Sequence, residues 1–201
     1  YIDFLLRGGQ RRSFSLANTP YDDDLLELHI RHLPGGVFSG HVFNDLKEGA
    51  LLRFEGPLGN FFLRDDSDRP MILMGGGTGF APVKGIMEQA LHLGLKRPMH
   101  IYWGARRPAD LYLDSLPRQW AGQASNIAYT PVLSDPEPAD EWRGATGFVH
   151  EQVVRDHPDL SGFDVYMSGP PPMINAAREA FAAAGLPSDR LFYDSFEAAP
   201  E

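Results

Sequence analysis

A short apolar run that leads into a glycine-rich loop constrains this chain more than any other feature. Residues 71–74 read Met-Ile-Leu-Met, and residues 75–82 read Gly-Gly-Gly-Thr-Gly-Phe-Ala-Pro. Glycine has no β-carbon, so it can adopt positive φ and let the backbone approach a bulky ligand closely. The amphipathic stretch after Phe80 would supply helical N–H groups to an anion. The sequence therefore predicts a phosphate-binding turn between a strand and a helix, with a nucleotide as its ligand.

The loop differs from the two commonest phosphate motifs. No Gly-Lys-Ser or Gly-Lys-Thr follows it, and Pro82 stands where the dinucleotide fingerprint has its third glycine. Kinase and ATPase functions are therefore disfavoured. Taken alone, the glycines are also compatible with a simple tight turn, so other segments must decide.

Composition sets outer limits on the function. The chain has 201 residues, 43% of them hydrophobic, which suffices for one large domain or two small ones. Its formal net charge of −9 argues against binding to nucleic acid, for which a basic surface is expected. No apolar run approaches the roughly 18 residues of a membrane span, so we expect no membrane span and a cytoplasmic protein.

Cysteine is absent, which removes disulfides, thiolate metal sites and thiol nucleophiles together. Any iron–sulfur cluster would therefore have to lie on another domain or protein. The seven histidines show no spacing typical of a zinc site, so we assign no metal to this chain. Gly-x-Ser-x-Gly is also absent, which leaves a serine hydrolase without support.

The first part of the chain has the pattern of an antiparallel barrel or sandwich. It begins at Tyr1 in an alternating segment without a methionine, so we expect an N-terminal portion of this domain to be missing. One short helix is predicted over 38–46. Turn residues separate the predicted strands, which are 1–6, 12–17, 25–31, 51–55 and 60–63.

From residue 69 onward, predicted strands alternate with predicted helices. The strands are 71–74, 99–103, 127–132, 163–168 and 191–193, and the helices are 80–93, 114–121, 147–156 and 172–184. Such alternation predicts a parallel sheet with helices on both faces and a ligand at the carboxyl ends of the strands. The polar segment 64–70 is the expected linker, so we place the two domains at 1–66 and 67–201.

Four segments, in this order, resemble the signatures of the ferredoxin–NADP reductase superfamily. Arg12-Ser13-Phe14-Ser15 resembles its Arg-x-aromatic-Ser signature, and 35–39 (Gly-Gly-Val-Phe-Ser) its flavin pyrophosphate loop. Residues 75–82 resemble its pyridine-nucleotide loop, and 168–173 (Ser-Gly-Pro-Pro-Pro-Met) its Cys-Gly-Pro-x-x-Met segment. The wording of 28–36 and 56–59 is similar to iron–sulfur flavoprotein reductases of the CDP-6-deoxy-glucoseen reductase and aromatic oxygenase reductase type. The resemblance covers essentially the whole chain.

The resemblance implies that the first domain is a β-barrel that binds FAD. Arg12 would pair with a flavin phosphate, Phe14 would lie against the isoalloxazine ring, and Ser15 would donate to its N5 edge. Two glycines and a serine in the second loop leave room for the diphosphate of FAD, which favours FAD over FMN. The further residues implied in FAD binding are Ser13, His29, Ile30, Arg31, Gly35, Gly36, Phe38 and Ser39.

The second domain would bind the nicotinamide nucleotide through Gly77, Thr78 and Gly79. Gly169, Pro170 and Met173 would then surround the nicotinamide, although a methionine at this spacing is more often helix core. Arg106, with Arg107 beside it, would select NADPH if it bound a ribose phosphate and could equally be solvated. The overall resemblance favours NADH.

Four residues are implied in catalysis: Ser15, Ser168, Asp194 and Phe196. Ser168 stands where the family has cysteine, which puts any cysteine-dependent tuning in doubt. Asp194 would relay a proton or cap a strand, and these alternatives stay open. Phe196 would cover the flavin face that nicotinamide must approach.

The implied reaction moves a hydride from NADH to FAD and passes electrons to an iron–sulfur centre. The [2Fe–2S] cluster is expected on a domain or ferredoxin-like partner outside this chain, and the final acceptor is a terminal oxygenase or dehydrase. A first alternative is a flavin reductase that releases reduced flavin, which would not need the diphosphate loop ending at Ser39. A second alternative, from another class, is a non-catalytic regulatory module that binds a nucleotide.

Overall fold

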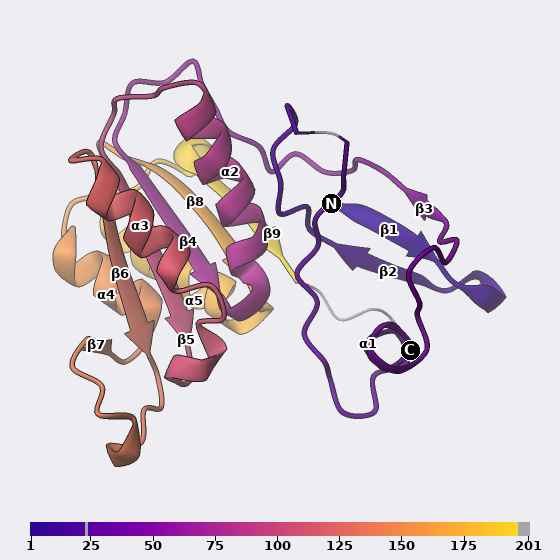
Figure 1. Cartoon of the computed structure of the whole chain (residues 1–201). Helices are drawn as coiled ribbons and strands as arrows, with labels where there is room; N and C mark the ends of the chain where they lie inside the picture. Colours follow the sequence, from indigo (N-terminus) through magenta and orange to yellow (C-terminus); the bar gives the residue numbers. More distant parts are fainter. Residues whose placement is uncertain (23, 197–201) are drawn as a thin grey trace.

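A parallel sheet of six strands forms the larger part of the molecule (Figure 1). The structure is a computed structural model that describes residues 1–22 and 24–196. The strand order is β7-β6-β5-β4-β8-β9, and every neighbouring pair is parallel. The strands are β4 (Met71–Gly76), β5 (Met99–Ala105), β6 (Ile127–Leu133), β7 (Ala145–Thr146), β8 (Asp164–Gly169) and β9 (Leu191–Ser195).

Helices cover both faces of this sheet. Along β4, Met71 and Leu73 pack into one core with α2 (Phe80–His92) and α3 (Ser115–Gln123). Ile72 and Met74 point to the other core, with α4 (Val149–Asp156) and α5 (Pro171–Ala183). Because the helix after β4 and the helix after β8 lie on opposite faces, a crevice is expected where these two neighbouring strands end. The predicted α/β domain is confirmed, and β7 is a short addition to it.

The smaller part contains a three-stranded antiparallel sheet in the order β2-β1-β3. Its strands are β1 (Ile2–Leu5), β2 (Arg11–Phe14) and β3 (Phe54–Glu55), and one helix, α1 (Val37–Asn44), packs on the sheet. The short 3₁₀ turns of the chain are η1 (Arg7–Gly9), η2 (Gly77–Gly79), η3 (Pro108–Asp110), η4 (Pro138–Asp140) and η5 (Ser188–Arg190).

Two strands predicted for this part are wrong. In segment 25–31, Leu28 forms an isolated bridge to Leu16, and none of the described strands includes residues of this segment. Leu25 is 77% exposed. Segment 60–63 leaves the sheet for the larger part, where the Phe61 ring lies 6.2 Å from the Tyr166 ring. Alternating apolar residues signal burial on one side, and packing against another domain satisfies that signal without a ladder.

The connection between the two parts is fixed by a buried arginine. The Arg97 guanidinium donates to the carbonyl oxygens of Arg64 at 2.7 Å and Arg69 at 3.2 Å, at either end of the predicted linker. It also forms an ion pair of 3.0 Å with Asp164, a residue with no exposed surface. The linker is thus bound to the larger part at both of its ends. Within the described ranges, no helix combines the length and the apolar character that crossing a membrane requires.

Candidate functional site

The glycine loop leaves β4 and enters α2 through η2, as the sequence predicts. Glycine is required at different positions of this loop for different physical reasons. A β-carbon on Gly79 would overlap the carbonyl oxygen of Ser168, and one on Gly76 would come within 2.5 Å of the Met173 sulfur. Gly77 instead has φ of +55°, and a β-carbon there would meet no described atom within 4 Å. Gly76 and Gly79 therefore allow close packing, whereas Gly77 makes the turn and faces open space.

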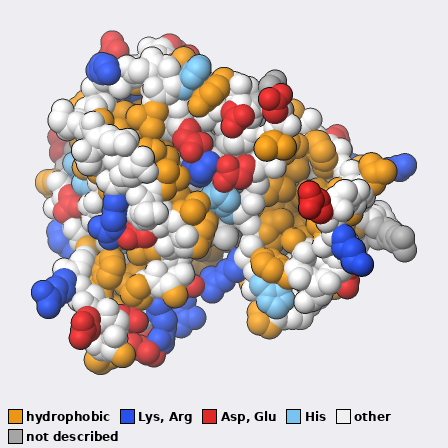
Figure 2. Space-filling model, in the orientation of Figure 1, with side chains coloured by type: hydrophobic (Ala, Val, Ile, Leu, Met, Phe, Trp, Pro, Cys, Tyr) orange, Lys and Arg blue, Asp and Glu red, His pale blue; other side chains and the backbone are white. Residues whose placement is uncertain are grey.

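That open space is a cavity of about 420 Å³ between the two parts of the molecule. His29, Ile30 and Arg31 line it from the smaller part, and Gly77, Thr78, Ala109, Asp110 and Tyr112 line it from the larger part. The Arg31 guanidinium lies 3.5 Å from the Asp110 carboxylate across it. On the face drawn in Figure 2, the surface is hollowed between the two parts and hydrophobic side chains border the hollow. Five residues predicted from separate motifs therefore share one cavity.

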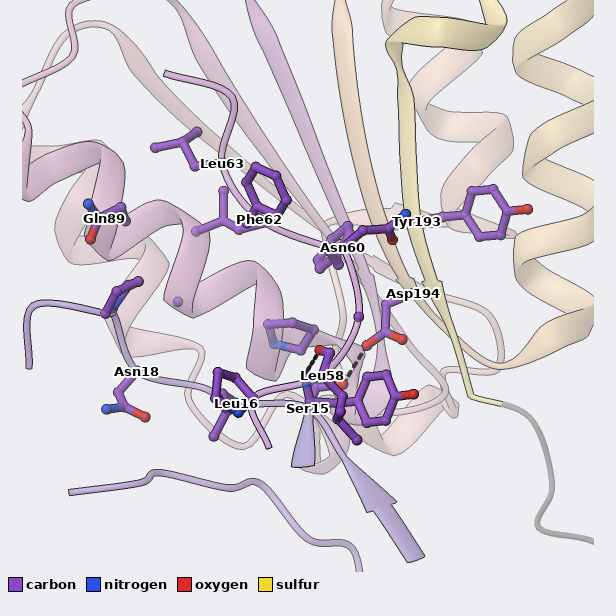
Figure 3. A pocket seen from close by; sticks show the side chains of 18 of the residues that line it. Ser15, Leu16, Asn18, Leu58, Asn60, Phe62, Leu63, Gln89, Tyr193 and Asp194 are labelled. Carbon is purple, nitrogen blue, oxygen red and sulfur yellow. Dashed lines mark hydrogen bonds between the residues drawn. The ribbon is translucent and has the colours of Figure 1, made fainter. Parts of the chain in front are cut away.

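A second cavity, of about 470 Å³, lies at the same junction and contains Ser15 and Asp194 (Figure 3). The Ser15 hydroxyl donates to the Asp194 carboxylate at 2.5 Å, and this bond joins β9 to the segment after β2. Leu16, Leu58, Phe61 and Ile86 give the cavity apolar walls. The structure thus brings together two of the four residues predicted to be catalytic.

Ser168 and Phe196 lie beside this pair. Ser168 is the register neighbour of Asp194 on β8, and the Phe196 N–H donates to the carbonyl oxygen of Gly169 at 3.0 Å. The Ser168 hydroxyl is fully buried and has no hydrogen-bond partner within the described part of the chain. An unsatisfied buried hydroxyl is costly, so its presence here marks a position where a ligand atom would be stabilised. Met173 packs against Gly76 and Gly169, so its thioether borders the same loops.

The other residues predicted to bind flavin line neither of the two cavities. Phe14 and Phe38 pack in the core of the smaller part, with ring centroids 5.1 Å apart. The Ser13 hydroxyl donates to Asp3 at 2.6 Å, and the Arg12 guanidinium donates to the Arg11 carbonyl oxygen at 2.8 Å. None of these four residues, and none of Gly35, Gly36 and Ser39, lines either junction cavity. Their roles in flavin binding stay predictions.

Ser39 makes hydrogen bonds within the predicted diphosphate loop. Gly35 has φ of +78°, and a β-carbon on Gly36 would come within 2.6 Å of the Ser39 hydroxyl. That hydroxyl accepts from the Leu33 N–H at 3.1 Å and lies within hydrogen-bond distance of the Leu33 carbonyl oxygen. Ser39 therefore holds the loop in shape. In the described residues no side chain caps the start of α1, which leaves its first N–H groups for an anion.

Arg106 and Arg107 are both paired with acidic residues. Arg106 lies 3.2 Å from Asp135 and Arg107 lies 2.5 Å from Glu137, on the loop that follows β6. The ion pair with Glu137 raises the pKa of Arg107 and lowers that of Glu137. Both guanidinium groups therefore already have a carboxylate partner on the loop that follows β6.

Sequence reasoning missed the residues around Tyr112. Asp110 and Tyr112 follow β5 by several positions, and Lys84 lies in the middle of α2. None belongs to a recognisable motif, and a single lysine in an amphipathic helix is normally solvated. The one available signal was that Lys84 lies two residues after Pro82, on the first turns of the helix that the glycine loop enters. As for metals, no group of three or more His, Asp or Glu side chains suited to binding an ion occurs in residues 1–22 and 24–196.

Two family models cover most of the chain. Residues 73–179 match the oxidoreductase NAD-binding domain, and residues 2–63 match the oxidoreductase FAD-binding domain. The chain belongs to the oxidoreductases that combine these two domains. These matches, together with the relatives described next, confirm the predicted resemblance to the ferredoxin–NADP reductase superfamily.

Individual relatives agree with the family match. The chain is 46% identical over 196 residues to the CDP-6-deoxy-L-threo-D-glycero-4-hexulose-3-dehydrase reductase of Yersinia pestis, covering 98% of this chain and 58% of the relative. It is 39% identical over 201 residues to the reductase subunit of an aromatic O-demethylase of an Amycolatopsis species, covering 98% and 59%.

A solved structure is also similar. The crystal structure of the Amycolatopsis cytochrome P450 reductase GcoB matches with a TM-score of 0.89 and 38% identity, covering 98% of this chain and 60% of that one. The chain therefore spans a little under two thirds of the length of these relatives.

Proposed function

We propose that this chain is the FAD- and NADH-binding portion of an electron-transfer reductase. The observation that carries the proposal is the cavity of about 420 Å³, which one wall of the FAD-binding domain and the glycine loop of the NAD-binding domain line together. A site built from both domains suits two nucleotides that must meet. The relatives named above are reductases of dehydrase and oxygenase systems, which supports the same reading.

The residues present fit both nucleotides. Gly77 and Thr78 face open space at the start of α2, and the start of α1 at Gly36 has no side-chain cap among the described residues, so two helix starts offer N–H groups to diphosphates. The buried Ser168 hydroxyl supplies a hydrogen bond that no described residue uses. When bound, the cofactors supply hydride transfer from nicotinamide to flavin and the onward release of electrons.

The residues of this chain would contribute to the reaction by orienting the reacting groups and by placing polar atoms beside them. Ser15, held at 2.5 Å by Asp194, presents its oxygen at the domain junction in a fixed position. Asp194 accepts the one hydrogen bond that the Ser15 hydroxyl can donate, which leaves the lone pairs of the Ser15 oxygen free to accept from a bound group. We infer that Met173 excludes water from the same region, since its side chain lies against Gly169, and the backbone of Phe196 is bound to the same glycine.

The pairing of the two arginines favours NADH over NADPH. A 2′-phosphate would have to displace Asp135 from Arg106 and Glu137 from Arg107, and the two carboxylates would repel it. NADH lacks this phosphate, and its ribose hydroxyl can donate to a carboxylate.

We propose that the electrons leave for a [2Fe–2S] domain or a ferredoxin-like partner and then for a terminal oxygenase or dehydrase. The names of the relatives support this class of partner. Domain bounds of 1–66 and 67–201 and a cytoplasmic location also stay predictions.

An anaerobic titration tests the function. Protein loaded with FAD is mixed with NADH or NADPH while the visible flavin absorbance is recorded. We expect bleaching near stoichiometric NADH and a requirement for about tenfold or more NADPH, since two opposing carboxylates disfavour its extra phosphate. The variant Asp135→Asn should reduce the difference between the NADH and NADPH concentrations that bleach the flavin, because it removes one of the two opposing carboxylates. Protein that takes up no FAD, or whose flavin neither nucleotide bleaches, would contradict the proposal, and fast loss of reduced FAD would point to a flavin-releasing reductase.

A further inference from the structure

Four polar side chains form a continuous chain of contacts that crosses the domain junction. Lys84 Nζ on α2 lies 2.9 Å from Glu27 Oε2, and Glu27 Oε1 lies 2.9 Å from His29 Nε2. His29 Nδ1 then lies 2.7 Å from the Tyr112 hydroxyl. Lys84 and Tyr112 belong to the NAD-binding domain, whereas Glu27 and His29 belong to the FAD-binding domain. This series of contacts therefore begins and ends in the NAD-binding domain and passes through two residues of the FAD-binding domain.

The Glu27 carboxylate fixes the direction of the two hydrogen bonds that it makes. The Glu27 carboxylate can only accept, so Lys84 donates to one of its oxygens and the Nε2–H of His29 donates to the other. His29 Nδ1 lies within hydrogen-bond distance of the Tyr112 hydroxyl, and either the ring nitrogen or the hydroxyl can be the donor, according to the tautomer. Lys84 is thus connected to Tyr112 through two intermediate side chains, Glu27 and His29.

The Lys84 end of these contacts is buried, whereas the Glu27 and Tyr112 side chains are partly exposed at the domain junction. Lys84 is 7% exposed, and it also donates to the Ala17 carbonyl oxygen at 3.1 Å and to Glu88 at 3.0 Å. Burial opposes the charges of Lys84 and Glu27, but their hydrogen bonds outweigh it, so the pKa of Lys84 is raised and that of Glu27 is lowered. Both groups therefore stay ionised at neutral pH, and the Lys84 ammonium is held by three acceptors, on Ala17, Glu27 and Glu88.

The end of the chain of contacts touches the candidate nucleotide site directly. His29 and Tyr112 line the cavity of about 420 Å³ from opposite domains. The Tyr112 ring packs edge-on against Trp103 with centroids 5.1 Å apart, and the Trp103 indole N–H donates to the carbonyl oxygen of Gly77 at 3.0 Å. Movement of Tyr112 would therefore reach the glycine loop through one side chain.

We propose that Lys84, Glu27, His29 and Tyr112 form an interdomain latch that positions the flavin-binding and nicotinamide-binding walls of the cavity at the separation needed for hydride transfer. The latch rests on the proposed function. Its members are positioning residues, because Lys84 and Glu27 act through His29 and Tyr112. Misplacing reacting groups by about 1 Å can cost about a hundredfold in rate, so loss of the latch should affect the rate more than the binding of either nucleotide.

Two latch variants and one matched control test this proposal. Lys84→Met removes the ammonium and keeps the length of the side chain, whereas Tyr112→Phe removes only one oxygen and keeps the ring on Trp103. Lys96→Met is the control, since Lys96 is exposed and outside the junction. Stopped-flow reduction of the FAD-loaded protein gives the limiting rate and the NADH concentration for half-maximal rate. Hydrogen–deuterium exchange of the flavin-free protein gives the protection of residues 16–29 and 80–88.

We expect each latch variant to lower the limiting rate about tenfold or more, with the half-maximal NADH concentration and the Kd for FAD changed by less than about threefold. Combining Lys84→Met with Tyr112→Phe should cost little more than the worse single change, because the members act as one unit. In the flavin-free protein, exchange in 16–29 should rise in both variants and stay unchanged in Lys96→Met.

Limiting rates and exchange that match the control in both variants would overturn the latch. A rate loss explained wholly by weaker FAD binding would overturn it too, because the four residues would then be cofactor ligands. If Lys84→Met fails to fold, Tyr112→Phe decides by the same criteria. If the unmodified protein is not reduced by NADH, the proposed function fails, and the exchange measurement alone still decides whether the four contacts hold the domains together.

Discussion

Ser168 is the residue at which stability and activity should separate. Its buried hydroxyl has no partner in the described residues, so Ser168→Ala removes an unsatisfied polar group. We expect the free energy of unfolding of the nucleotide-free protein to stay constant or rise by about 1 kcal/mol. The limiting rate of flavin reduction by NADH should fall about tenfold, which corresponds to about 1.4 kcal/mol of lost transition-state stabilisation.

Urea denaturation and stopped-flow reduction measure the two effects, with Ser125→Ala as the control at an exposed serine. A loss of more than about 1 kcal/mol in stability would mean that the hydroxyl is hydrogen-bonded after all. The serine itself could be singled out from the sequence, because it replaces a cysteine in a recognisable segment. Its lack of a partner could not, since that depends on the register of β8 against β4 and β9.

Among the elements, the glycine loop separates backbone strain from packing. Gly77 and Gly94 have φ of +55° and +65°, and a β-carbon on either would meet no described atom within 4 Å. Gly77→Ala and Gly94→Ala should therefore cost about the same, roughly 1–2 kcal/mol of stability, from the left-handed backbone alone. Only Gly77→Ala should also weaken NADH binding. Gly79→Ala should cost more than either, because its β-carbon would overlap the Ser168 carbonyl.

Urea denaturation and NADH titration of the three variants check this order. Equal NADH affinity in Gly77→Ala and Gly94→Ala would remove Gly77 from the proposed site. The sequence was enough to predict a tight loop here. It could not distinguish a glycine that makes room for Met173 from one that faces the cavity, because that distinction depends on residues about a hundred positions away.

The contact between β5 and α4 should make the fold sensitive to acid. His100 Nδ1 lies 3.2 Å from His157 Nε2, and the Tyr102 hydroxyl donates to Asp156 beside them. Burial and the proximity of His157 lower the pKa of His100 to about 4, and burial also lowers the pKa of His157. Protons therefore bind the unfolded chain more readily than the folded one. The stability contributed by these neutral side chains is complete above about pH 6.5 and is lost as the pH falls toward 4.

The free energy of unfolding, measured by urea denaturation at several pH values between 4 and 7, should fall by up to about 1.4 kcal/mol per pH unit for each proton taken up. His100→Asn should flatten this slope, and His41→Asn, at an exposed histidine, should leave it as in the unmodified protein. An unchanged slope in His100→Asn would show that other groups control the acid response. The element bounds themselves were largely predictable, whereas this pairing of two histidines from different elements was not.

At the scale of the whole molecule, Arg97 ties the interdomain linker to the parallel sheet. Arg97→Met leaves the fully buried Asp164 without its principal partner and frees two linker carbonyls. We expect a loss of about 3–5 kcal/mol in the free energy of unfolding. Arg118→Met breaks an exposed ion pair with Asp114 of 2.6 Å and should cost less than about 1 kcal/mol.

Urea denaturation of both variants measures the difference, and equal costs would contradict the role of Arg97. The division into two halves was predictable because the hydrophobic pattern changes from short alternating runs to strands and helices. The contact of Arg97 with Asp164 and the linker was not predictable, because Arg97 and Asp164 are 67 positions apart and neither belongs to a recognisable motif. The same reasoning applies to the two wrong strands at 25–31 and 60–63, because whether a segment joins a ladder depends on distant partners that its own residues do not specify.

The hydrogen bond between Ser15 and Asp194 also has a consequence in time. It joins residues 179 positions apart, and Asp194 lies on β9 at the edge of the sheet. A growing polypeptide emerges from the ribosome in order, so the segment carrying Ser15 is made long before the strand that meets it. The junction therefore closes only after the strand at 191–195 has been made. A chain interrupted before residue 191 already contains the glycine loop, but the carboxylate that accepts the Ser15 hydrogen bond has not yet been made.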